Sequence, residues 1–199
     1  EQSQMPHGPV THTKAWIEMI HRYMAMAVGG LILTLAAFAW VRRWRSESAS
    51  GVLWPTFTLL WVCVQGAFGA LTVTMKLFPL IVTLHLMGGL VLLALLTLQV
   101  QRQRLSSERS LSVLVSPALY VATLVGLFLL TLQVLLGGWV STNYAVLACN
   151  TFPQCQGGWW PLMNFEQGFT LWRHLGLDAN GQPLVFEALT AIHYVHRLA

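Results

Sequence analysis

The chain has 199 residues, of which 55% are hydrophobic and only 9% are charged, and its formal net charge is +4. A soluble domain has about 25% charged residues, so this composition excludes a disordered chain and an ordinary cytosolic enzyme. It also excludes a nucleic-acid-binding protein, because the 11 basic residues cluster at the ends of apolar runs, where membrane proteins need them. The chain is therefore predicted to lie in a lipid bilayer.

Four apolar stretches are each long enough to cross a bilayer, which takes about 20 apolar residues in a helix. Outer segments are predicted at residues 1–20 and in a long loop at about 141–183, and residues 184–199 are expected to start another helix. The expected fold class is an all-α integral membrane protein. The four predicted membrane helices span about residues 21–42, 52–76, 79–101 and 112–139.

The basic residues predict how these helices are oriented. Arginines gather in the first and third connections, whereas the second connection has only Lys76 and the long loop only Arg173. Because cytoplasmic connections are enriched in lysine and arginine, the first and third are predicted to be cytoplasmic. The N-terminal segment, the Lys76 connection and the long loop are then expected on the outer, periplasmic side. The arginines concerned are Arg42, Arg43, Arg45, Arg102, Arg104 and Arg109.

Two short patterns occur twice along the chain. A glutamine is followed by a glycine four residues later and a threonine five residues after that, and a His-Arg pair also recurs. This recurrence indicates a duplicated helical unit, hence a bundle of two pseudo-repeated halves, residues 1–110 and 111–199. The alternative is that helix faces rich in small residues look alike because close packing demands it. The recurring segments are Gln65–Thr74 and Gln133–Thr142, with the pairs His21-Arg22 and His196-Arg197.

Three histidines are predicted to share one depth in the bilayer, near the outer ends of their helices: His21, His85 and His196. Imidazole is rare inside a membrane and usually faces a bundle interior or a site, and histidines on facing helices commonly ligate heme iron. We interpret the three as heme ligands, the alternative being hydrogen-bonded packing residues. His193 is expected to be a neighbour of the site. The remaining histidines are expected on polar outer segments, and they are His7, His12 and His174.

Glu18 precedes His21 by three residues, which places both on one face of a helix. A carboxylate beside a metal centre can accept a proton or orient water. The alternative is an interfacial carboxylate favoured by the helix dipole. In the second His-Arg pair the corresponding position is His193. Arg22 and Arg197 are predicted to pair with heme propionates, unless they only extend toward the membrane interface.

Cys149 and Cys155 lie in the predicted outer loop, where an oxidising compartment favours a disulfide. A redox-active or metal-binding pair is the alternative, although neither a Cys-x-x-Cys spacing nor accompanying zinc ligands occur there. Cys63 is expected to be buried by packing in the second membrane helix.

The sequence resembles the bacterial heme A synthase family over nearly its whole length. Members of that family have eight helices in two four-helix halves, and each half holds one heme between two histidines. The resemblance implies that about five of the eight helices are present here, beginning after the first and ending inside the sixth, without the fourth histidine. The matching segments are Trp16–Ala25 with its Glu-x-x-His-Arg pattern, Gln65–Thr74, Thr83–His85, Gln133–Thr142, the cysteine pair and His196-Arg197.

The resemblance implies a membrane-bound, heme-dependent oxidoreductase that converts heme O to heme A by oxidising a ring methyl group to a formyl group. His21 and His85 then match the ligands of the substrate heme O, and Glu18 matches the carboxylate needed for the oxidation. His196 matches one ligand of a heme b cofactor that passes electrons. Cys149 and Cys155 match the disulfide of the outer loop.

The resemblance also implies the bacterial inner membrane, with heme sites near the periplasmic face. Expected partners are membrane lipid, heme O synthase (the farnesyltransferase), cytochrome oxidase assembly factors and further copies of the chain in a homo-oligomer. A competing interpretation is a bis-histidine cytochrome b type electron-transfer protein, which would need the same histidines without Glu18. A transporter is favoured only by the repeat and would be expected to have broken helices near the bilayer midplane.

Overall fold

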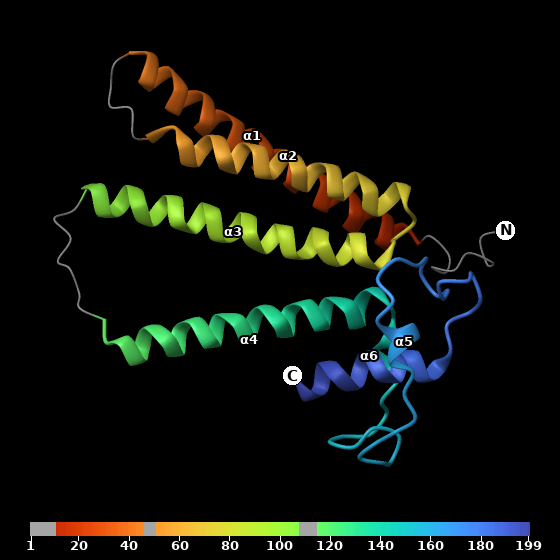
Figure 1. Cartoon of the computed structure of the whole chain (residues 1–199). Helices are drawn as coiled ribbons and strands as arrows, with labels where there is room; N and C mark the ends of the chain where they lie inside the picture. The colour runs from red at the N-terminus through yellow and green to blue at the C-terminus, as the bar shows by residue number, and fades with distance from the viewer. Residues whose placement is uncertain (1–10, 46–50, 108–114) are drawn as a thin grey trace. The chain divides into compact units, whose positions relative to one another are not determined.

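The computed structural model describes residues 11–45, 51–107 and 115–199, and within them the chain is helical or irregular with no β-strand. Long helices come first, and a loop region with short helices follows them (Figure 1). In chain order the helices are α1 (His12–Trp44), α2 (Leu53–Thr74), α3 (Pro79–Ser107), α4 (Pro117–Thr142), the 3₁₀ helix η3 (Ala145–Leu147), α5 (Phe165–Gly168) and α6 (Phe186–Leu198).

Helices α1 to α4 are each long and apolar enough to cross a membrane. Their outward faces carry large apolar side chains, among them Leu33 and Phe38 on α1 and Phe128 on α4. Soluble proteins rarely expose continuous apolar surface of this kind. The predicted all-α, multi-pass membrane protein is therefore confirmed. The expectation for Cys63 is wrong, because its side chain is exposed; hydropathy does not distinguish a lipid-facing position from a packed one.

Helix boundaries differ from the sequence prediction where caps decide them. α1 begins at His12 rather than near residue 21, because the Thr11 side chain accepts the amide of Lys14 and caps the helix. Hydropathy marks only the apolar part of a helix, so this polar beginning escaped it. α4 begins at Pro117, after Ser116 accepts the amide of Leu119. The expected start near residue 112 lies outside the described residues, as does His7.

The chain divides into two compact units. Unit 1 comprises Glu1–Ala67 with Leu92–Ser107, and unit 2 comprises Phe68–Val91 with Glu108–Ala199. Both α2 and α3 therefore contribute one part to each unit. The division into repeated halves near residue 110 is a different partition of the chain and stays a prediction.

In unit 1, polar and aromatic side chains join the last part of α1, the first part of α2 and the last part of α3. The Trp40 indole of α1 donates to the Thr56 hydroxyl of α2 at 3.0 Å. The Gln99 amide of α3 donates to the hydroxyl of Thr58, whose residue is 1% exposed. The Arg102 guanidinium of α3 lies 4.3 Å from the centre of the Trp54 ring of α2, which is a cation–π contact.

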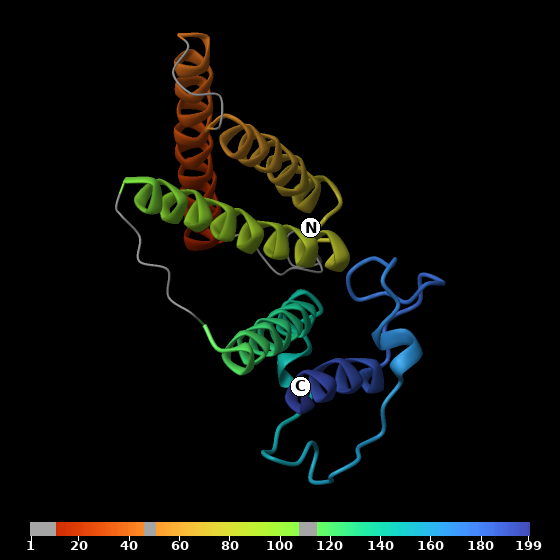
Figure 2. The same cartoon turned by 60° about the vertical axis from the view of Figure 1, so that its left-hand side comes forward.

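In unit 2, α6 lies beside α4 and is covered at its beginning by α5 (Figures 1 and 2). The Trp139 indole at the end of α4 donates to the carbonyl of Gly168 in α5 at 3.0 Å. A Cβ atom at Gly168 would stand only 2.9 Å from the carbonyl oxygen of Ala188 in α6, so α5 contacts the α6 backbone itself. The buried core here consists of Trp139, Val140, Ala145 and Ile192.

The start of α3 is also fixed within unit 2. Lys76 (φ 53°) and Leu77 (φ 60°) adopt left-handed backbone and reverse the chain sharply after α2. Phe78 follows, is 2% exposed, and packs against Trp172 with ring centres 4.7 Å apart. The His174 ring contacts Phe78 edge-on at 5.5 Å. The loop between α4 and α6 thus holds the start of α3 in place.

We expect Gly168→Ala, in the whole protein, to lower the free energy of unfolding by about 1–3 kcal/mol, because the obstructing atom is backbone and moves only with α6. Thermal unfolding in detergent measures the effect. Gly126→Ala in α4 is the matched control, because a Cβ there would meet no atom of the described residues within 4 Å. Equal unfolding temperatures for the two variants would contradict the close approach of α5 and α6.

Candidate functional site

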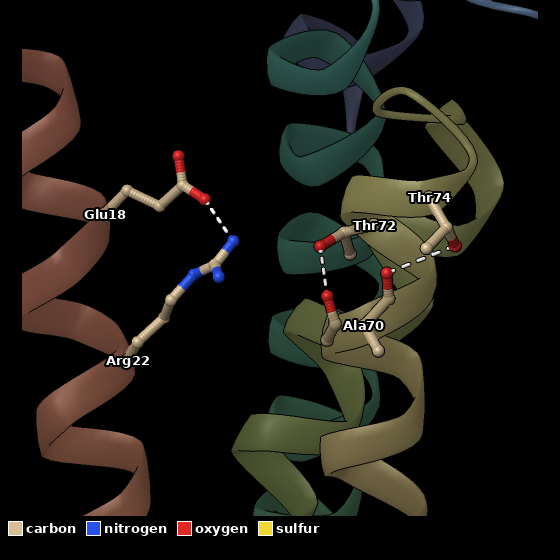
Figure 3. Close-up of polar contacts among 6 residues, drawn as sticks. Glu18, Arg22, Ala70, Thr72 and Thr74 are labelled. Atoms are coloured by element: carbon tan, nitrogen blue, oxygen red, sulfur yellow. Dashed lines mark hydrogen bonds and ion pairs between the residues drawn. The ribbon is translucent and has the colours of Figure 1, made fainter.

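Glu18 and Arg22 form an ion pair along one side of α1. Nη2 of Arg22 donates to Oε1 of Glu18 at 2.5 Å, and Figure 3 shows the two side chains directed toward each other. The exposed fractions are 58% for Glu18 and 49% for Arg22, and an exposed pair one turn apart stabilises a helix by only about 0.5 kcal/mol. Figure 3 also shows the second carboxylate oxygen directed away from the guanidinium. The pair orients the carboxylate and leaves one oxygen accessible.

The helix start at His12 changes how Glu18 is interpreted. The first turn of α1 contains no acidic residue, so Glu18 lies beyond it. Dipole stabilisation fades within the first turn, and a purely dipolar role for this carboxylate is therefore not favoured. His21 follows on the same helix and is exposed. Glu18, His21 and Arg22 all belong to unit 1.

His85 of α3 lies against a glycine of α2 within unit 2. A Cβ atom at Gly69 would stand 3.2 Å from Cε1 of His85 and 3.8 Å from its Nε2. The backbone at this point is held by threonines: the Thr72 hydroxyl donates to the Gly69 carbonyl at 2.7 Å and that of Thr74 to the Ala70 carbonyl at 3.2 Å (Figure 3). The imidazole therefore occupies the space that a side chain at Gly69 would take.

His196 of α6 has the corresponding relation to α4. A Cβ atom at Gly137 would stand 3.1 Å from Cε1 of His196 and 3.5 Å from its Nε2. One turn earlier on α4, Nε2 of Gln133 donates to the His196 carbonyl at 3.3 Å. Nδ1 of His196 is buried and has no hydrogen-bond partner among the residues that the structure describes. A histidine retained only for packing would be expected to satisfy such an atom.

The predicted Cys149–Cys155 disulfide is confirmed, and Arg197 holds the loop that it closes. Nη1 of Arg197 donates to the carbonyls of Thr151 at 2.5 Å and Gln154 at 3.1 Å, and Nη2 donates to that of Cys149 at 3.0 Å. A guanidinium group is suited to binding several carbonyls at once, because its donors lie in one plane in a fixed arrangement. The pairing of Arg197 with a heme propionate stays a prediction, whereas its described hydrogen bonds go to the loop and to His193.

His193 links the same loop to α6. It is 8% exposed, its Nε2 lies 3.1 Å from Nε of Arg197, and its Nδ1 lies 3.3 Å from the amide nitrogen of Cys149. A neutral imidazole accepts at one nitrogen only, so either tautomer satisfies one of these two donors. Both nitrogens face the arginine and the loop, which agrees with a neighbour of the site rather than an iron ligand.

Arg173 is a buried cation, whereas the sequence analysis used it only to predict the orientation of the helices. It is 3% exposed, and its Nη2 donates to Oδ1 of Asn143 at 2.6 Å. Its guanidinium lies 5.7 Å from the centre of the Trp139 ring. Burial lowers the pKa of the Arg173 guanidinium from its ordinary value. Nothing in the sequence around Arg173 indicated that its side chain is buried. Its contacts with Asn143 and Trp139 hold the loop against the end of α4.

The structure groups the predicted site residues by unit. His85, His196, Arg197 and the disulfide lie in unit 2, whereas Glu18, His21 and Arg22 lie in unit 1, and the pairing of His21 with His85 stays a prediction. Among the described parts of the chain, no three His, Cys, Asp or Glu residues gather as a metal cluster. The glycines that contact the imidazoles were missed as site residues, although the recurring Gln-x-x-x-Gly pattern contained them.

These features describe a multi-pass helical membrane protein in which the imidazoles of His85 and His196 are seated against glycines of neighbouring helices. The whole chain, residues 1–199, matches the family model COX15-CtaA, the cytochrome oxidase assembly proteins. The chain belongs to this family. No solved structure matches it.

Two curated relatives carry one name, heme A synthase. The chain is 38% identical over 201 residues to the heme A synthase of Shewanella oneidensis, an alignment covering 99% of this chain and 58% of that protein. It is 26% identical over 165 residues to the heme A synthase of Halalkalibacterium halodurans, covering 82% of this chain and 54% of that protein. The chain thus spans a little over half the length of these relatives.

The arginine contacts predict that Arg197→Lys, which keeps the charge but not the planar donors, loosens the disulfide loop. We expect amide exchange in residues 149–156 to become about tenfold faster, because losing charge-assisted bonds to carbonyls costs about 1.5 kcal/mol or more. Hydrogen-exchange mass spectrometry of the whole protein measures this. Arg45→Lys at the end of α1 is the control, and unchanged exchange in Arg197→Lys would refute the role of the guanidinium in holding the loop.

Proposed function

We propose that this chain is the greater part of a heme A synthase, which oxidises a methyl group of heme O to a formyl group. The observation that carries the proposal is the match of all 199 residues to the COX15-CtaA family. The 38% identity to a heme A synthase over 99% of the chain supports the same activity. The proposed residues are Glu18 for catalysis, with His21 and His85 as ligands of the substrate and His196 as a ligand of heme b.

The residues present suit a heme group. His196 has a buried Nδ1 that the described residues leave without a hydrogen bond, and its ring is seated against Gly137 in an apolar helix contact. Neutral imidazoles in such surroundings are the usual axial ligands of membrane hemes. A bound heme b would supply one-electron transfer to and from the substrate site. His196 would hold it from the α6 side.

Glu18 is proposed to take up a proton during oxidation of the substrate methyl group. If the electrons of the broken C–H bonds leave through the proposed heme b, the corresponding protons must be taken up separately, and a carboxylate beside the substrate would accept them. Arg22 binds one oxygen of Glu18 at 2.5 Å and so favours one orientation of the carboxylate, while the second oxygen points away from the guanidinium. Arg22 thereby acts as a positioning residue for the carboxylate.

The membrane setting of the proposed enzyme follows from the arginine distribution. We propose the bacterial inner membrane, with the disulfide loop and the imidazoles toward the periplasm, because an oxidising compartment maintains Cys149–Cys155. Heme O synthase, cytochrome oxidase assembly factors and a homo-oligomer are the proposed partners. A cytochrome b type electron carrier is the less favoured alternative, because it has no use for Glu18.

Replacing Glu18 by glutamine in the whole protein tests the catalytic role. The amide keeps the size of the side chain, but it is far less basic than a carboxylate and cannot serve as the proton acceptor. We therefore expect formyl-heme production to fall about hundredfold or more, with heme binding retained. Pyridine hemochrome analysis of membranes supplied with heme O measures both. Glu187→Gln, in the first turn of α6, is the matched control. Wild-type product in Glu18→Gln would exclude the proposed proton transfer.

Replacing His196 by alanine tests iron ligation. We expect the low-spin absorption of one heme to be lost, because one axial imidazole is removed. His193→Ala, one turn earlier on the same helix, removes a histidine whose nitrogens face the loop, and we expect it to retain that low-spin absorption. Absorption spectra of the purified whole protein compare the two. Retention of the low-spin band in His196→Ala, or its loss in His193→Ala, would overturn the assignment.

A further inference from the structure

Gly69 and Gly137 lie inside helices with ordinary helical backbone, since neither has positive φ. Glycine at such a position destabilises a helix relative to alanine. The backbone therefore does not require glycine at either place. Lack of space for a side chain does explain the two glycines, because each α-carbon faces an imidazole of a neighbouring helix.

The two contacts agree in detail although they involve different helices. At both glycines the nearest atom to a built Cβ is the Cε1 of the histidine, at 3.2 Å for His85 and 3.1 Å for His196. Both ring nitrogens follow within 4 Å in each case. The same edge of each ring, the one that carries both nitrogens, is thus pressed against a glycine. An added methyl group would displace that edge by a few tenths of an ångström.

Other helical glycines of the same helices do not share this relation. A Cβ atom on Gly66 of α2 or on Gly126 of α4 would meet no atom of the described residues within 4 Å. Gly138, next to Gly137, faces aliphatic atoms of Leu86 and Thr83 instead. The imidazole contact is therefore specific to the glycine that follows the recurring glutamine by four residues.

The backbone around each contact is held as well. Within α2, the Thr72 hydroxyl donates to the carbonyl of Gly69 at 2.7 Å, which holds the local backbone of the helix at the glycine. On α4, the Gln133 amide binds the carbonyl of His196 at 3.3 Å. Gln133 and Gly137 lie one turn apart and so contact the backbone and the ring of the same histidine.

We propose that Gly69 and Gly137 are positioning residues that set the orientation of the His85 and His196 imidazoles at two heme irons, with Gln133 assisting at His196. The inference rests on the proposed function, because it takes both histidines as axial ligands. Ligands at such sites must be held within about 0.5 Å of the productive geometry, and the expected displacement by a methyl group is of this order. Iron ligands that turn or tilt change the electronic state and the reduction potential of the heme.

The experiment compares Gly69→Ala and Gly137→Ala in the whole protein, purified with the hemes acquired from the host membrane. We expect each variant to shift the low-spin electron paramagnetic resonance signal and the midpoint potential of one heme, a different heme in each variant. Gly66→Ala and Gly126→Ala are the matched controls on the same two helices, and both are expected to retain the wild-type signals.

Unchanged signals and potentials in Gly69→Ala and Gly137→Ala would overturn the positioning role. Loss of one heme, with an unfolding temperature of the heme-free protein equal to that of the controls, would support it. Should Gly137→Ala fail to fold, Gln133→Met removes the donor to His196 without adding a clash, and it is expected to shift the same heme; an unchanged signal there overturns the proposal for α4. If His85→Ala and His196→Ala keep both low-spin signals, ligation itself is wrong, which separates failure of the proposed function from failure of the glycine contacts.

Discussion

The approach of an imidazole to a glycine on the neighbouring helix sets the geometry of unit 2. Within a bilayer there is no hydrophobic force to press helices together, so close contact depends on small residues and on a few hydrogen bonds. Gly137 and Gln133 supply both to α6, and Gly69 gives the corresponding space to His85 of α3. A larger residue at either glycine would move the ring, the helix or both.

In both His-Arg pairs the arginine contacts the residue four positions earlier, but that residue differs between the two pairs. In α1 the arginine binds a carboxylate, Glu18, which remains half exposed. In α6 the arginine donates to the imidazole of His193 through Nε and to carbonyls of the disulfide loop through Nη1 and Nη2. The same helical spacing therefore orients an accessible acid in one case and anchors the disulfide loop in the other. Under the proposed function this difference separates a site for oxidation from a site for electron transfer.

The sequence was sufficient for features that depend on local composition. Four membrane helices follow from apolar length, and the disulfide follows from two nearby cysteines in an outer loop. Features set by tertiary contact escaped it. Hydropathy missed the start of α1 because Thr11 caps a polar turn, and it assigned Cys63 to the interior although lipid-facing and packed positions have the same polarity. The Gln-x-x-x-Gly pattern was visible, but the ring that each glycine receives lies on another helix.

The anchoring of the disulfide loop bears directly on His196. Arg197 is its neighbour in sequence, and His193 lies one turn before it, so the residues that hold Cys149 and Thr151 share a single stretch of α6 with the proposed ligand. Gln133 and Gly137 of α4 contact the same stretch through His196. A ring held only by the glycine contact could still rotate together with its helix. Because the loop and α4 bind α6 through different residues, that rotation would break hydrogen bonds to both, so the backbone that carries the imidazole is restrained from two directions.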